Sequence, residues 1–107
     1  MRALAANMLR RAGFDVEEAA SGTEAVAKWR NSSAPFDLLL TDVVMPEVTG
    51  PELAAALRGT RTDLRVLFMS AYVGHPALKH VPEDRDKVLG KPFSNEALLR
   101  AVYAVLA

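Results

Sequence analysis

The stretch that decides the fold is residues 36–44, with the sequence FDLLLTDVV. Its members are apolar except for Asp37, Thr41 and Asp42. A strand of a parallel sheet covered by helices on both faces has such a continuous apolar run. A strand with one face exposed to water instead alternates apolar and polar residues. Residues 36–44 therefore predict a buried strand in an α/β fold with a parallel sheet.

Helical and strand patterns alternate on both sides of this strand. Ser21 and Thr49 are each followed three residues later by Glu, which predicts capping boxes, and Ser94 caps the last helix. Strands are expected over residues 14–19, 36–44, 64–69 and 88–89, and helices over residues 3–12, after Ser21, after Thr49, over residues 73–81 and after Ser94. The expected order is α-β-α-β-α-β-α-β-α, as in a doubly wound sheet with helices on both faces.

Helical spacing predicts which side chains face the core. The predicted inner positions are Leu4, Met8, Leu9 and Ala12 in the first helix, Leu53, Ala56 and Leu57 in the third, and the pairs 97–98, 101–102 and 105–106 in the last. Gly13 is expected to end the first helix in a left-handed conformation.

Size and composition limit the classes of protein. The chain has 107 residues, 13 basic and 13 acidic side chains and no cysteine. This fits one domain over residues 1–107 with no net field to attract nucleic acid or anionic lipid. No run approaches the roughly 20 apolar residues that cross a bilayer. We expect a soluble cytoplasmic protein whose partners are proteins or small ions.

Three polar residues end the predicted strands: Asp42, Ser70 and Lys91. Functional groups gather at the carboxyl ends of strands in an open parallel sheet. A carboxylate can be the nucleophile in phosphoryl transfer, an ammonium group can balance charge on phosphoryl oxygens, and a hydroxyl can donate a hydrogen bond to one of them. The set is suited to phosphoryl transfer.

The residues around these positions resemble the receiver domains of response regulators and hybrid histidine kinases. The matching stretches are residues 42–46 (DVVMP) with 49–50 (TG), 67–72 (LFMSAY), 90–93 (GKPF) and, more loosely, 20–25 (ASGTEA). The resemblance implies a flavodoxin-like doubly wound parallel sheet with the strand order 2-1-3-4-5.

The same resemblance implies a signalling switch rather than an enzyme. Asp42 would accept a phosphoryl group from a histidine kinase or phosphotransfer protein, Ser70 and Lys91 would contact that group, and a downstream protein would bind the modified face. Mg²⁺ would be held by Asp42 and the backbone carbonyl of Val44. The peptide bond before Pro92 would be cis.

Two features depart from the family pattern. Val88 stands where the family usually has an aromatic switch residue, and Tyr72 is only a conjectural substitute. The family's first strand and its acidic metal-binding pair are absent, because Met1 matches the beginning of the first helix. We therefore expect weak Mg²⁺ binding and poor phosphorylation of this chain. A misassigned start codon is one hypothesis, which the upstream coding sequence would test, and a strand-sharing homodimer is another consequence of unpaired strand edges.

Two other functions stay open. One is a degenerate receiver that is never phosphorylated and serves as a protein-interaction or dimerisation module. The other is an aspartate-nucleophile phosphatase, whose pattern has a second carboxylate where Val44 stands. Glu47 is interpreted as an exposed loop carboxylate rather than a metal ligand. His75 and His80 are spaced too far apart for one helical face and predict no metal site.

Overall fold

The computed structural model describes residues 2–33, 35–45, 47–71 and 87–107. Within these ranges the elements are α1 (Arg2–Arg11), α2 (Gly22–Asn31), β1 (Leu38–Asp42), α3 (Gly50–Arg58), β2 (Arg65–Ser70), β3 (Lys87–Gly90) and α4 (Asn95–Leu106). The helix predicted over residues 73–81 lies outside the described residues.

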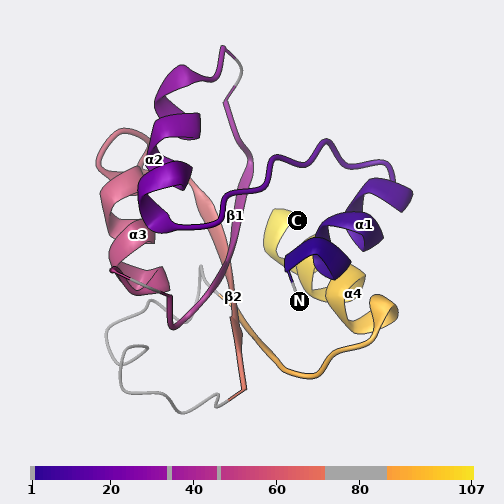
Figure 1. Ribbon diagram of the computed structural model, residues 1–107. Helices are drawn as coiled ribbons and strands as arrows, with labels where there is room; N and C mark the ends of the chain where they lie inside the picture. The colour runs from indigo at the N-terminus through magenta and orange to yellow at the C-terminus, as the bar shows by residue number, and fades with distance from the viewer. Residues whose placement is uncertain (1, 34, 46, 72–86) are drawn as a thin grey trace.

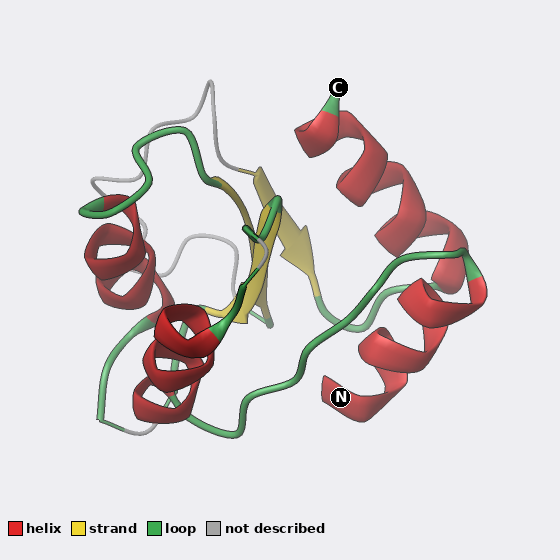
Figure 2. Ribbon diagram, turned by 90° about the horizontal axis from the view of Figure 1, so that it is seen from above, coloured by secondary structure: helices red, strands yellow, loops and turns green. Residues whose placement is uncertain are grey.

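The three described strands form one parallel sheet in the order β1-β2-β3. Helices α1 and α4 lie on one side of this sheet, and α2 and α3 lie on the other (Figures 1 and 2). The α/β class with a parallel sheet and helices on both faces is therefore confirmed.

Strand β2 lies at the centre of the sheet and is the most deeply buried element. Leu64, which precedes it, and Val66, Leu67 and Phe68 within it are each at most 1% exposed. Val66 and Phe68 belong to the core cluster with α3, and Leu67 belongs to the cluster with α1 and α4. Alternate side chains of this strand thus reach both helical layers.

The helical faces differ in part from the prediction. Leu4 is 51% exposed and Ala12 is also exposed, whereas α1 buries Ala5, Ala6 and Leu9. Ala5 and Leu9 belong to the core cluster with α4, and the small side chain of Ala5 allows the two helices to pack closely. In α3, Ala54 is buried and the predicted Ala56 is exposed. In α4, Leu98, Val102 and Val105 are buried, which confirms the predicted stripe.

The predicted caps begin their helices, but one capping box is incomplete. Thr49 forms both hydrogen bonds of its box with Glu52. The Ser21 hydroxyl accepts a hydrogen bond from the Glu24 N–H, while the Glu24 carboxylate forms an ion pair with Lys28 at 3.3 Å. Gly13 has φ +97°, as expected for a left-handed helix end.

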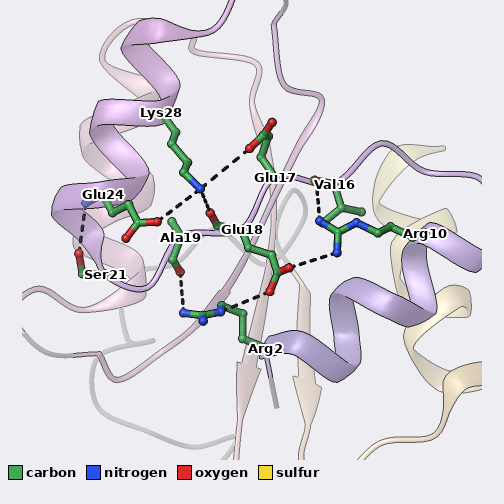
Figure 3. A network of polar contacts seen from close by, with 9 residues as sticks. All are labelled: Arg2, Arg10, Val16, Glu17, Glu18, Ala19, Ser21, Glu24 and Lys28. Carbon is green, nitrogen blue, oxygen red and sulfur yellow. Dashed lines mark hydrogen bonds and ion pairs between the residues drawn. The ribbon is translucent and has the colours of Figure 1, made fainter.

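Residues 14–19 are not a strand, so this prediction was wrong. Among the described residues, no strand pairs with the edge of β1 opposite β2, and the segment has no ladder to join. Side chains bind its carbonyl groups instead: Arg10 donates to Val16 O at 3.0 Å, Arg2 donates to Ala19 O at 3.4 Å, and Lys28 donates to Glu18 O (Figure 3). The expected first half of the 2-1-3-4-5 order is therefore not formed in the described part of the chain.

Candidate functional site

The three residues that the sequence places at strand ends meet at one edge of the sheet. Asp42 is the last residue of β1, Ser70 is the last residue of β2, and Lys91 directly follows β3. Asp42 pairs in register with Met69, and Ser70 pairs with Gly90. The Lys91 N–H donates to Ser70 O at 2.9 Å, which fixes the residue after β3 against the end of β2.

An ion pair joins the two charged members of the site. The Lys91 Nζ contacts Asp42 Oδ1, and the two side chains are 24% and 35% exposed. This oxygen of Asp42 is fully buried, and the Lys91 ammonium is the charged group that contacts it. The remaining exposure of both side chains leaves the pair open to a reactant.

Ser70 lies deeper than the charged pair. It is 7% exposed and is held at the end of β2, the central strand. The next bond after Lys91, to Pro92, is cis, as the resemblance implies. The geometry thus collects a carboxylate, an ammonium group and a hydroxyl-bearing residue at the carboxyl edge.

The loop after Asp42 is fixed by contacts that the sequence did not single out as part of the site. The Val43 N–H donates to Met69 O at 3.0 Å, and the Gly50 N–H donates to Val43 O at 2.8 Å. A Cβ atom on Gly50 would lie 2.2 Å from Asp42 O, so only glycine fits there without a shift. The sequence marks Thr49 and Gly50 as a helix start and as part of the family match, but it does not predict the contact of Gly50 with Asp42, which lies eight residues away in sequence.

Two threonines also support this loop. Thr41 is 5% exposed, and its hydroxyl donates to Asp42 O at 3.0 Å. The Thr23 hydroxyl donates to Glu47 Oε2 at 2.9 Å. Glu47 has a left-handed φ of +74°, which is uncommon for a residue other than glycine. Its exposed carboxylate is thus engaged by α2, in agreement with its interpretation as a loop residue.

Comparisons with known proteins agree with this arrangement. The family model of the response regulator receiver domain matches residues 1–103. This chain belongs to the response regulator receiver family. It is 37% identical over 99 residues to the sensor kinase CckA of Brucella abortus, covering 92% of this chain and 10% of that protein. It is 34% identical to the receiver protein CpdR of the same organism, covering 99% of this chain and 88% of CpdR.

Solved receiver structures share the fold. The chemotaxis protein CheY4 of Vibrio cholerae matches with a TM-score of 0.85 and 33% identity, over 98% of this chain and 88% of that one. The flavodoxin-like receiver fold is therefore established for this chain. Receiver domains are signalling modules of two-component systems.

The carboxylates for a complete metal site are not found in the described residues. No group of three or more His, Asp or Glu residues there could hold a metal ion, so Asp42 belongs to no such cluster within the described ranges. Val44, the other predicted ligand, lies two residues further on with a side chain that is 62% exposed. Mg²⁺ requires near-octahedral oxygen coordination, which these two residues fill only in part. The receiver TrrA of Thermotoga maritima, 26% identical with a TM-score of 0.79, was solved in complex with Mg²⁺ and BeF.

The remaining predicted positions add little to the site. Val88 packs against the core cluster on the α3 side of the sheet. Tyr72, His75 and His80 lie outside the described residues. No helix in the described ranges is long and apolar enough to cross a membrane.

Proposed function

We propose that this receiver domain accepts a phosphoryl group on Asp42 from the phosphohistidine of a histidine kinase or phosphotransfer protein. The observation that carries this proposal is the convergence of Asp42, Ser70 and Lys91 at the carboxyl edge of the sheet. A carboxylate oxygen of Asp42 forms a bond to phosphorus while the bond from phosphorus to the histidine nitrogen breaks. The nitrogen keeps the electron pair, and the product is an aspartyl phosphate.

Lys91 and Ser70 stabilise the group that is transferred. The Lys91 ammonium already contacts Asp42, so it lies where the negative charge of the phosphoryl oxygens develops. Opposite unit charges about 4 Å apart interact by about 4 kcal/mol at an effective dielectric constant of 20. The Ser70 side chain, at the end of the neighbouring strand, donates a hydrogen bond to a phosphoryl oxygen.

Phosphorylation of this chain is expected to be slow. Mg²⁺ supplies charge neutralisation when it is bound in phosphoryl-transfer sites. Asp42 and the Val44 carbonyl form only part of such a site, and within the described residues Asp42 belongs to no cluster of three or more potential metal ligands. The chain must therefore rely more on Lys91 for charge balance.

Labelling with acetyl phosphate tests the proposal. The intact mass of the protein should increase by one phosphoryl group, and Asp42→Asn should abolish this increase. Asp37→Asn is a matched control, because Asp37 precedes the other end of β1 and is 83% exposed. Equal labelling of wild type and Asp42→Asn would contradict the proposal.

A degenerate receiver is the second candidate function, favoured because the described residues hold no cluster of three or more side chains that could bind a metal ion. Such a protein binds a downstream partner or a second copy without being phosphorylated. Absence of any label on folded wild-type protein, with either acetyl phosphate or a phosphorylated histidine kinase, would support this function over the first.

A further inference from the structure

The loop between β1 and α3 contacts the first turn of α2 as well as the end of β2. Helices α2 and α3 lie on the same side of the sheet (Figures 1 and 2). Within the described part of this loop, Glu47 and Val48 contact α2, and Val43 bonds to β2. The loop that follows Asp42 is thus fastened to the sheet and also to a helix that carries none of the three site residues.

The backbone of Glu47 is held in an unfavourable conformation. Its φ of +74° lies in the left-handed region, which residues with a side chain rarely adopt. Such a conformation persists where the surrounding contacts impose it, and residues of this kind cluster at functional sites. The Thr23 hydroxyl, in the first turn of α2, donates a hydrogen bond to Glu47 Oε2 at 2.9 Å. This bond therefore stabilises the left-handed conformation of Glu47.

Val48, the next residue, packs against the start of the same helix. A Cβ atom added to Gly22 would lie 2.4 Å from Val48 Cγ2, so this side chain is in close contact with the backbone of α2. Gly22 is buried although it is the first residue of its helix. Val48 also packs against the core cluster that contains Leu53 of α3. A polar and an apolar contact thus join two neighbouring loop residues to one helical turn.

The ends of the loop are joined to the backbone of Asp42. Val43 follows Asp42 directly and is 1% exposed. Its N–H donates to Met69 O at 3.0 Å, and its carbonyl oxygen accepts from the Gly50 N–H at 2.8 Å. The Gly50 backbone passes so close to Asp42 O that an added Cβ atom would lie 2.2 Å away. A shift of the loop therefore moves the peptide group of Asp42, because closely packed groups transmit strain.

We infer that Thr23 and Glu47 are positioning residues for Asp42. Their hydrogen bond fastens the loop to α2 and so holds the backbone of Asp42 in the orientation that presents its carboxylate to Lys91. Neither residue touches the reacting atoms. The inference rests on the proposed phosphorylation of Asp42 and extends control of that reaction to a helix outside the site.

Amide hydrogen exchange tests whether α2 fastens the loop. Thr23→Val removes the hydroxyl but keeps the branched shape, so the Gly50 amide, which closes the loop on Val43 O, should exchange about three to ten times faster. Thr23→Ser keeps the hydroxyl and should exchange as the wild type does. The amides of β2 report global unfolding and serve as the internal reference. Unchanged exchange at Gly50 in Thr23→Val, or equal acceleration at Gly50 and in β2, would overturn the inference.

Labelling kinetics with acetyl phosphate test whether the fastened loop positions Asp42. Glu47→Ala and Glu47→Gln remove the same charge, but only glutamine keeps an oxygen that can accept from the Thr23 hydroxyl. Glu47→Ala should lower the maximal labelling rate at least about threefold, because a misplaced reacting group reacts more slowly. The acetyl phosphate concentration at half-maximal rate should not change. Glu47→Gln should label at close to the wild-type rate, and equal slowing in both variants would contradict the inference.

A double variant separates this contact from independent effects of the two residues. Thr23→Val combined with Glu47→Ala should label no more slowly than the slower single variant, because both changes remove the same hydrogen bond. Effects that multiply would show that the two residues act separately and would exclude the inferred role. Absence of label on folded wild-type protein would contradict the proposed function and leave the two residues no reaction to position. Exchange at Gly50 would still decide whether they fasten the loop.

Discussion

Lys91 is the charged neighbour that the structure gives to the buried oxygen of Asp42. Lys91→Gln should slow formation of the aspartyl phosphate at least tenfold, because the ammonium group is lost where negative charge develops. The rate is measured by intact mass against time with acetyl phosphate. Arg100→Gln, which removes a positive charge from a side chain that is 74% exposed, should leave the rate unchanged. Equal slowing in both variants would show that net charge alone matters.

Gly50 supports the same site through its lack of a side chain. Gly50→Ala should lower the free energy of unfolding by about 1–3 kcal/mol, since the new Cβ would lie 2.2 Å from Asp42 O. Urea denaturation measures this change. Gly59→Ala is the matched control at the end of α3, where φ is −59°, and should change stability by no more than about 1 kcal/mol. An unfolding free energy of Gly50→Ala equal to that of wild type would show that the loop shifts readily to accommodate the added methyl group.

At the residue scale, a site residue could be predicted where a reactive side chain stands at the end of an apolar run in the sequence. Asp42, Ser70 and Lys91 were found because each interrupts or follows an apolar run at a strand end. The roles of Gly50 and Thr23 were not found, because they depend on contacts with Asp42 O and Glu47 that only the folded chain brings about.

The capping box of α3 makes stability depend on pH. The hydrogen bond from the Thr49 N–H lowers the pKa of Glu52, and the Thr49 side chain adds to this effect. A carboxyl group whose pKa is lower in the folded state stabilises the protein above its unfolded pKa, near 4.5. That stabilisation is lost as the pH falls through the folded pKa.

Glu52→Gln removes this titration. The difference in unfolding free energy between wild type and Glu52→Gln should therefore shrink as the pH is lowered from about 7 to about 3. Chemical denaturation at several pH values measures it. A difference that stays constant with pH would contradict the assignment of the shift to Glu52.

The hydrogen bond from the Glu52 N–H to the Thr49 hydroxyl, the other half of this capping box, can be tested separately. Thr49→Ala should cost about 1 kcal/mol in unfolding free energy, because the Glu52 N–H loses its acceptor. Thr49→Ser keeps the hydroxyl and should restore most of this stability. Urea denaturation of the three proteins gives the comparison, and equal loss in both variants would exclude the cap as the cause.

At the element scale, strands and helices were predictable where the pattern is strong. A strand within residues 36–44 and the last helix were confirmed, although the strand covers only Leu38–Asp42 and its three leucines are partly rather than fully buried. Residues 14–19 were predicted as a strand from local composition, but a strand needs a neighbour, and the described residues provide none beside β1. Arginine and lysine side chains bind the carbonyl groups of the segment in its place.

At the scale of the whole molecule, the chain combines a receiver fold with a site in which Asp42, Ser70 and Lys91 meet at the carboxyl edge of the sheet. The fold class could be predicted because the apolar runs and caps recur along most of the chain.

The most direct test of the central claim is borohydride trapping after labelling with acetyl phosphate. Borohydride reduces an aspartyl phosphate to homoserine, and mass spectrometry of the peptides then identifies its position. The account predicts homoserine at position 42, formed slowly, and none in Asp42→Asn. Homoserine at another aspartate, or its absence from folded protein, would contradict the account.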